Sequence, residues 1–468
     1  MAETDQEADV PSAGCLADRR ERRRPGPALT FLGGVAGVSG VRYLVEGPST
    51  TLLIGCGFCA GPEVAWQRNF SPGPAELHSA DAVILPSADL AHSGFLPQLV
   101  AEGWHGPVYA TPGTAALLPV ALSDAARQFA EDAVAAEVGG WSVRRPVLPP
   151  FREDDVARVV SLVRAVEWGT PRRLEGAEFE FGHAGGRLGA AWVRVSIGGR
   201  SVVFSGPLGS AGHPLLGPPD PRPPTEAVVL AAPRPAGDSY VAGRFAGAIH
   251  RALKRGGGVV VPASAVGSTE VVLTMIHDLT EAGRIPRLPV VLDGPAGLAG
   301  VEVHRRAVAE RWSELRQDIR VELPGLFAEH TNGGPPDRPS IVVAGPATAD
   351  TGRVLGHLAT VLPDARAGVV LLGPQGQGTR VAQLAQGARH LKIHGRYLPV
   401  RAEVTVLAGT GEFAGPAEVQ AWAMAAPPPE TAFLVEGEPD ASRALAKTLH
   451  ARAGWCAVVP DDGERVLW

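Results

Sequence analysis

Four side chains in the first quarter of the chain could together hold a metal ion. Cys56 and Cys59 are spaced C-x-x-C in a glycine-containing turn, and Asp89 and His92 follow the apolar run 82–85. Thiolate, imidazole and carboxylate groups are the usual zinc ligands, and a tetrahedral site needs about four of them. These residues define one hypothesis, a rebuilt single-metal site. The second C-x-x-C pair that would strengthen it is missing, so we favour the alternative of two small buried thiols in a tight turn.

The composition is that of a large globular protein. The chain has 468 residues, of which 45% are hydrophobic, with 4 Cys and a formal net charge of −6. This length predicts about two to three domains. No apolar run reaches the roughly 18 residues of a membrane span, and no secretion signal is recognisable, so we expect a cytoplasmic protein with reduced thiols and no membrane contact. The negative charge gives no general attraction to RNA, which would need a local basic patch.

The apolar pattern predicts a leader followed by two kinds of domain. Residues 1–28 combine charge with Pro, Gly and Ser and predict a disordered leader. Short apolar runs then predict buried strands at 51–54, 82–85, 108–110, 202–204 and 228–230, with a helix at 153–166. From 236 to 395 strands and helices alternate, which is typical of a parallel sheet. In this region we expect strands at 259–261, 290–292, 341–344 and 369–372, and helices at 244–254, 268–282 and 353–361.

Several segments between about Leu29 and Trp468 resemble motifs of the β-CASP branch of the metallo-β-lactamase superfamily. Pro86–Gly94 corresponds to the family turn T-H-A-H-L-D-H-S-G, and Val261–Gly267 corresponds to I-P-A-F-A-V-G. The resemblance implies an α/β fold, in which an αββα metallo-β-lactamase sandwich carries an inserted parallel α/β domain, the β-CASP domain. The implied boundaries are 29–235 and 396–468 for the sandwich, which the chain re-enters through strands at 403–407 and 433–435, and 236–395 for the insert.

The same resemblance implies that the metal centre is degenerate. Family members hold two zinc ions, which clamp the attacking and leaving oxygens of an RNA phosphate. Of the ligands in the first motif only His92 is kept, because the other positions hold Ser87, Asp89 and Ala91. The later ligand positions hold Gly186, Pro207 and Glu436, and two further β-CASP motif positions, an acidic residue and a general-acid His, hold Ala231 and Phe413. The resemblance therefore implies no catalytic residue and no bound metal or other cofactor.

These losses imply a catalytically inactive pseudo-hydrolase or pseudo-nuclease. We expect a binding or scaffolding subunit whose partner is an active β-CASP paralogue or a second copy of itself. Two alternatives stay open: a hydrolase or nuclease with a rebuilt single-metal or metal-free site, and a ligand-sensing module that uses the cleft between the domains. RNA binding is doubtful, because the family Arg after F-A-V-G is Ser268. Arg353 and His357 are the candidates for a residual anion contact.

Overall fold

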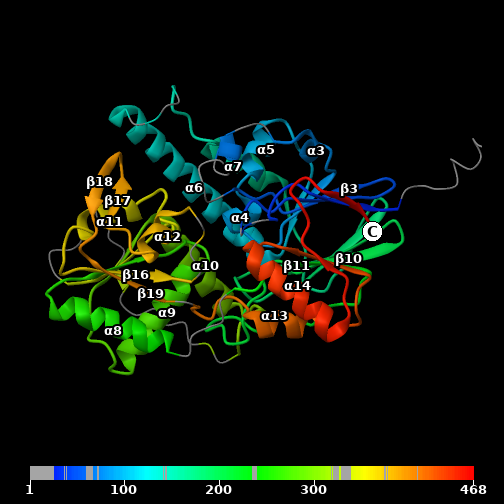
Figure 1. Ribbon diagram of the computed structural model, residues 1–468. Helices are drawn as coiled ribbons and strands as arrows, with labels where there is room; N and C mark the ends of the chain where they lie inside the picture. The colour runs from blue at the N-terminus through cyan, green and yellow to red at the C-terminus, as the bar shows by residue number, and fades with distance from the viewer. Residues whose placement is uncertain are drawn as a thin grey trace, which may run out of the picture.

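The computed structural model describes residues 26–468 apart from 36, 38, 60–66, 71–72, 141, 143–144, 235–239, 318, 320–325, 328–338, 374–375, 377 and 408. The predicted leader therefore lies outside the described residues except for its last three positions. Of these, Ala28 begins the first strand. Two lobes lie side by side, one containing both chain ends of the described region and the other built from residues 240–407 (Figure 1).

The first lobe is a sandwich of two seven-stranded sheets. One sheet has the order β22 (Arg465–Leu467), β1 (Ala28–Phe31), β2 (Tyr43–Glu46), β3 (Thr51–Ile54), β4 (Ala82–Ile84), β5 (Val108–Ala110) and β6 (Val163–Ala165). The other has the order β21 (Ala457–Val458), β20 (Thr431–Val435), β11 (Ala227–Ala231), β10 (Arg200–Phe204), β9 (Ala191–Ile197), β8 (Ala177–His183) and β7 (Arg172–Leu174).

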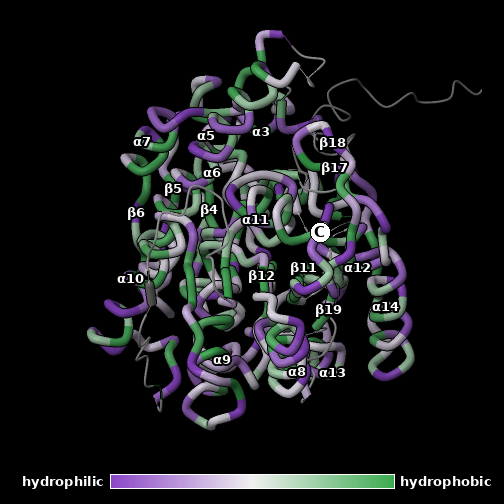
Figure 2. The backbone as a smooth tube through the Cα atoms, turned by 90° about the vertical axis from the view of Figure 1, so that its left-hand side faces the viewer, coloured by the Kyte–Doolittle hydropathy of each residue, from purple (hydrophilic) through white to green (hydrophobic). Residues whose placement is uncertain are grey.

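Side-chain alternation along the strands builds a core on each face of the first sheet. In β3, Leu52 and Ile54 face the second sheet, whereas Leu53 faces the outer helices. Because both faces are covered, the strand is a continuous apolar run. The outer helices are α3 (Ala75–His78), α5 (Leu96–Ala101), α6 (Pro112–Gly139) and α7 (Glu153–Leu162) on the first sheet, and α13 (Pro416–Ala423) and α14 (Pro439–Ala453) on the second. In Figure 2 the hydrophilic turns of α14 lie at the periphery of the molecule.

The second lobe is a parallel sheet covered by helices on both faces. Its order is β14 (Leu326–Phe327), β13 (Val290–Asp293), β15 (Ile341–Ala344), β12 (Val259–Pro262), β16 (Gly368–Leu372) and β19 (Glu403–Leu407). Helices α8 (Val241–Lys254), α9 (Ser268–Glu281) and α10 (Pro295–Ala309) contribute to one core, and α11 (Val354–Val361) and α12 (Arg380–Ala385) to the other. A hairpin of β17 (His390–Ile393) and β18 (Arg396–Pro399) extends from this lobe.

Two expectations about boundaries are wrong. The strand 403–407 was expected to belong to the sandwich, but β19 pairs in parallel with β16 at the edge of the inserted sheet. The chain therefore returns to the sandwich after Leu407 rather than at 396. The helix expected at 153–166 ends at Leu162, because Val163–Ala165 adds a strand beside β5. Within the described residues, no helix is both long and apolar enough to cross a membrane.

Candidate active site

The turn after β4 carries the centre of the site on a short helix. Asp89 precedes α4 (Leu90–Ser93), and His92 lies three positions later, which places both side chains on one face. Asp89 Oδ1 lies 2.9 Å from His92 Nδ1, and Asp89 Oδ2 accepts a hydrogen bond from the Ser87 hydroxyl at 3.1 Å. Ser87 is 1% exposed and His92 is 2% exposed. The turn therefore fixes the imidazole rather than leaving it mobile.

Glu436 reaches the same imidazole from the second sheet. It follows β20, and its Oε2 lies 3.2 Å from His92 Nε2. The backbone of Glu436 is left-handed, with φ at 55°, and its amide donates to the Gly34 carbonyl at 2.8 Å. A left-handed residue with a side chain is energetically unfavourable and is commonly retained where that side chain must be aimed. His92 therefore contacts one carboxylate that follows a strand of the first sheet and one that follows a strand of the second.

The two carboxylates keep His92 protonated. Burial alone lowers the pKa of His92, but Asp89 and Glu436 outweigh burial and raise it from 6.5 to about 10. Burial also raises the pKa of Asp89, but His92 and Arg187 together hold that pKa well below its usual range. An imidazole that donates from both ring nitrogens has no lone pair for a metal ion.

Two guanidinium groups pack against the ring of Phe413. The Arg187 and Arg234 guanidinium carbons lie 5.2 Å and 5.7 Å from the centre of the Phe413 ring. Arg187 Nε lies 3.4 Å from Asp89 Oδ2, a charge contact without hydrogen-bond alignment. Burial lowers the pKa of Arg234, while the Glu436 carboxylate opposes that shift. Phe413, the expected substitute for a general-acid histidine, is therefore the platform on which two cations pack.

Arg187 also joins the two lobes. Its Nη1 donates to the carbonyl of Val266, in the turn between β12 and α9. Gly267 follows with φ at 102°, and a Cβ there would lie 2.1 Å from Arg187 Nη1. Only glycine therefore lets the guanidinium pass at this point. The side chain that joins the two lobes is therefore a cation, and it directly follows Gly186, a position where the family resemblance implies a metal ligand.

The donor set does not fit the two-zinc centre that the family would imply. Ala91, Pro207 and Gly186 offer no side-chain ligand, and a Cβ at Gly186 would lie 2.8 Å from the Pro207 carbonyl oxygen and 3.2 Å from the Phe413 ring. Ala231, at the end of β11, is buried and equally without a donor. Among the residues that the structure describes, no three His, Cys, Asp or Glu side chains are grouped so that they could hold a metal ion.

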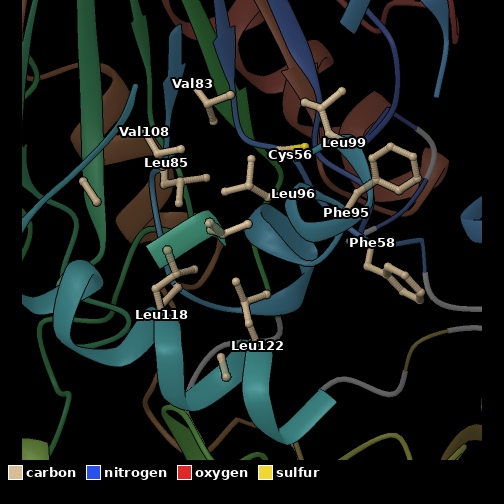
Figure 3. Close-up of a cluster of buried hydrophobic side chains, with 14 of the residues drawn as sticks. Cys56, Phe58, Val83, Leu85, Phe95, Leu96, Leu99, Val108, Leu118 and Leu122 are labelled. Atoms are coloured by element: carbon tan, nitrogen blue, oxygen red, sulfur yellow. The ribbon is translucent and has the colours of Figure 1, made fainter. Parts of the chain in front are cut away.

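The rebuilt site of Cys56, Cys59, Asp89 and His92 is not assembled. Cys56 is fully buried, and its thiol lies in the apolar core beside Leu96 and Leu99 (Figure 3). Burial raises the pKa of this thiol to about 12, which keeps it protonated, whereas zinc binds the thiolate. Only its backbone touches the site, through an amide that donates to the His92 carbonyl at 2.7 Å. Core packing in a tight turn therefore describes Cys56.

The expected anion contact at Arg353 and His357 is already satisfied within the chain. Asp293, at the end of β13, accepts from Arg353 Nη1 at 2.9 Å and lies 2.7 Å from His357 Nε2. The side chains of Asp293 and His357 have no exposed area. A carboxylate of the protein thus takes the place that we expected for an external anion.

Sequence reasoning missed Arg187, Arg234 and the buried Glu412. Arg187 directly follows the lost ligand position 186, and Glu412 directly precedes Phe413. Glu412 is 8% exposed, and its Oε1 has no hydrogen-bond partner among the described residues. For Arg187 and Glu412 the usable signal was a charged residue directly beside a position that had lost a functional side chain, whereas Arg234 has no such neighbour.

Comparison with known proteins finds one match to part of the inserted lobe and others that extend over most of the chain. Residues 269–384 match the Beta-Casp domain. Ribonuclease TTHA0252 of Thermus thermophilus is 32% identical over 438 residues, which cover 90% of this chain and 95% of that protein. A crystal structure of a protein of unknown function from Enterococcus faecalis V583 covers 95% of this chain and 100% of its own, with a TM-score of 0.50 and 14% identity, and supports the fold alone.

Two archaeal relatives carry names related to RNA. Transcription termination factor FttA of Pyrococcus abyssi is 26% identical over 414 residues, 82% of this chain, which spans 61% of the length of FttA. The RNase J-like protein of Methanocaldococcus jannaschii is 22% identical over 446 residues, which cover 90% of this chain and 95% of that protein.

The expectation of a catalytically inactive chain is contradicted by these relatives. Proteins that align with it over most of its length are named a ribonuclease and an RNase J-like protein, and they point to an active nuclease rather than to a scaffold. The alternative, a hydrolase or nuclease with an altered site, agrees better with these findings. The inference of inactivity assumed that chemistry ends when the zinc ligands are lost, and it did not count the two guanidinium groups that pack against Phe413. By its identity to the Thermus protein and its Beta-Casp domain, this chain belongs to the β-CASP metallo-β-lactamase family.

Proposed function

We propose that this protein is a hydrolase that cleaves phosphodiester bonds of RNA at a site without a zinc pair. The observation that carries the proposal is the pair of guanidinium groups, Arg187 and Arg234, that pack against the Phe413 ring beside position 186. Planar guanidinium groups bind phosphate oxygens through paired N–H donors and stay charged at every physiological pH. The names of the relatives support RNA as the substrate class.

In this proposal each charged group has a separate task. Arg187 and Arg234 bind the non-bridging oxygens of the phosphate and stabilise the negative charge that grows on them during cleavage. The His92 imidazolium holds Asp89 and Glu436 in place, since it is bonded to both. Asp89 in turn holds Arg187 from one side. The buried ionic group thus acts as a fixed support for the phosphate-binding cations.

The contact of Arg187 with Val266 supports placing the RNA in the cleft between the lobes. A phosphate bound by this guanidinium would touch groups from both lobes at once. Pre-positioned charges that need no rearrangement during the reaction are the main source of such electrostatic stabilisation. In this proposal the protein works in the cytoplasm, where RNA is available.

Cleavage of an end-labelled RNA by protein purified through a chelator tests the proposal. We expect cleavage in EDTA that added zinc does not increase. Arg234→Gln should lower kcat/KM by about 10- to 150-fold, because a hydrogen bond to a charged group contributes about 1.5–3 kcal/mol. Arg443→Gln is the matched control, since Arg443 lies on the surface of α14, where it pairs with Asp440.

Each outcome of this experiment either supports the proposal or overturns it. Cleavage that survives EDTA and falls in Arg234→Gln, but not in Arg443→Gln, supports the proposal. An RNA left intact by the unmodified protein overturns it. Cleavage that appears only with zinc also overturns it, because the metal-free site would then be the wrong description.

A further inference from the structure

The hairpin of β17 and β18 carries a local concentration of positive charge. Residues 389–401 contain no Asp or Glu, whereas the chain as a whole has a formal net charge of −6. The Arg and Lys side chains of this segment are all exposed, namely Arg389, Lys392, Arg396 and Arg401. Within the described part of the chain, none of the four forms an ion pair with a carboxylate. These four cations, together with Tyr397, form a surface that we call the basic hairpin.

A tight turn fixes which side chains of the hairpin point outward. His394 and Gly395 both have positive φ, 46° and 75°, as in the two-residue turns that suit a regular hairpin. This turn sets Lys392 opposite Tyr397 across the two strands. Ile393, on the other face from Lys392, is buried in the core that α11 and α12 cover. The outward face of the hairpin therefore holds a cation and an aromatic ring as direct neighbours.

The cations of the basic hairpin differ from other exposed cations of the insert. Arg287 lies 3.2 Å from Glu281, and Arg366 lies 2.9 Å from Asp364. A cation with its own carboxylate has most of its charge compensated, whereas the four cations of the hairpin keep theirs available. An unpaired group of cations of this kind attracts a polyanion such as the phosphate backbone of a nucleic acid.

Tyr397 favours a single-stranded nucleic acid among polyanions. Its side chain is 71% exposed. An exposed tyrosine is ordinary by itself, but surfaces that bind single strands combine cations, which follow the phosphates, with aromatic rings, on which unpaired bases stack. Lys392 and Tyr397 supply the two features at one register position.

The basic hairpin is held firmly to the insert and lies apart from the candidate active site. Arg380 Nε donates to the Lys392 carbonyl at 2.8 Å, and its Nη1 donates to the Asp350 carbonyl at 2.7 Å. In Figure 1 the two strands project from the insert on the side away from α14. The insert meets Arg187 through a different segment, the turn between β12 and α9. We therefore expect the basic hairpin to contribute to binding and to leave the cleavage step unchanged.

We propose that the basic hairpin binds a single-stranded flank of the RNA substrate. This inference rests on the proposed function, which supplies RNA as the substrate class. The four cations bind phosphates of the flank, and Tyr397 stacks on an unpaired base. A chain of negative net charge needs a local basic patch to hold RNA, and the basic hairpin provides one. RNAs long enough to reach the hairpin should therefore bind more tightly than short ones.

Fluorescence anisotropy with a fluorescein-labelled single-stranded oligouridylate tests the role of the charges. Every protein in this assay carries Arg234→Gln, which slows cleavage of the probe. Each phosphate contact to a single strand contributes about 0.7 to the slope of log affinity against log salt concentration. The hairpin variant should therefore have a slope lower by about 2.8, so that its affinity falls roughly 50-fold less between about 50 and 200 mM salt. It carries Gln in place of Arg389, Lys392, Arg396 and Arg401.

A second variant, Tyr397→Ala, tests the stacking. It should raise Kd for the single strand by about 5- to 150-fold, the usual contribution of one stacked base. The salt slope should stay unchanged, because stacking releases no counterions. A double-stranded RNA probe has no unpaired base to offer, so its Kd should be the same with and without Tyr397→Ala.

The matched control removes the same amount of charge from positions that have acidic partners. We expect this control to bind the probe as the protein with an intact hairpin does, because its net charge changes as in the hairpin variant but its unpaired cations remain. Urea unfolding shows that both variants are folded. The control carries Gln at four exposed positions, Arg287, Arg305, Arg366 and Arg443.

A lower slope in the hairpin variant, weaker binding in Tyr397→Ala and an unchanged control support the proposal. Equal slopes in all proteins overturn it, and so does an equal reduction in the control, because net charge would then explain the effect. Hairpin-dependent binding to vesicles of phosphatidylserine, without binding to RNA, would assign this surface to a membrane and overturn the proposal as well. The proposed function is judged separately: RNA that binds through the hairpin but is left intact by the unsubstituted protein overturns cleavage alone.

Discussion

Replacement of His92 by Gln tests whether a buried imidazolium holds the two sheets together. The imidazole lies 2.9 Å from Asp89 and 3.2 Å from Glu436, and it is 2% exposed. Its pKa rises from 6.5 to about 10, which is about 3.5 units or roughly 5 kcal/mol at about 1.36 kcal/mol per unit. Removal of one partner from a buried ion pair costs about 3–5 kcal/mol, in agreement with that value. We therefore expect His92→Gln to lower the free energy of unfolding by about 3–5 kcal/mol at pH 6.

The stabilisation that His92 contributes should decrease as the pH rises. Because the folded pKa of His92 is above the unfolded value of 6.5, its stabilisation is complete below about pH 6.5 and is lost as the pH rises through about 10. The difference between the two proteins should therefore shrink from pH 6 to pH 10. Urea unfolding at pH 6, 8 and 10 measures it, and the ¹⁵N chemical shifts of the ring report protonation directly.

A surface pair provides the control for this comparison. His78 Nε2 lies 3.1 Å from Glu102 Oε2, but the His78 side chain is 35% exposed, so His78→Gln should cost less than about 1 kcal/mol. A loss below about 1 kcal/mol in His92→Gln at pH 6 would refute the reasoning. An equal loss at pH 6 and pH 10 would refute it as well, because a neutral imidazole would then explain the effect.

Two further substitutions test the description of the site. Gly186→His should lower the free energy of unfolding by about 1–3 kcal/mol through crowding against Phe413, and thermal unfolding with and without zinc should show no zinc-dependent rise in Tm; such a rise would contradict the description. Asp293→Asn should cost about 1–3 kcal/mol in urea unfolding, because Asp293 is the buried acceptor shared by Arg353 and the His357 ring, whereas Asp440→Asn at the exposed start of α14 should cost less than about 1 kcal/mol. Equal effects of the two aspartate variants would argue against this buried hydrogen-bonded cluster.

Much of the fold could be predicted from the sequence because its strands are buried on both faces. The runs at 51–54 and 341–344 became β3 and β15, since a strand covered on both sides must be apolar throughout. The segment 403–407 was correctly predicted to be a strand, but it was assigned to the wrong sheet. Glu403–Leu407 alternates charged or polar and apolar residues, which fits an edge strand of either sheet. Sequence alone does not say which neighbour a strand pairs with when both candidate edges are open.

The sequence predicted which ligands the site lacks, but it did not predict which groups replace them. A lost ligand can be read at its position, as at Gly186, because glycine has no side chain. What replaces the ligand cannot be read there, because the replacing groups come from positions that the motif does not include. Arg234 reaches Phe413 from a segment about 180 residues away in sequence, and only the folded chain shows their contact. Charge compensation depends on which residues lie close together in the folded chain, and a sequence motif does not show this.

The packing of Phe413 against position 186 has a consequence for how such a protein can change over generations. The ring occupies the volume that a side chain at position 186 would need, so a histidine introduced at 186 alone meets a structure adapted to Phe413, and a histidine introduced at 413 alone still lacks a partner at 186. Selection for the two-zinc site that the family resemblance implied would therefore need several coordinated substitutions, each unfavourable before the rest are in place.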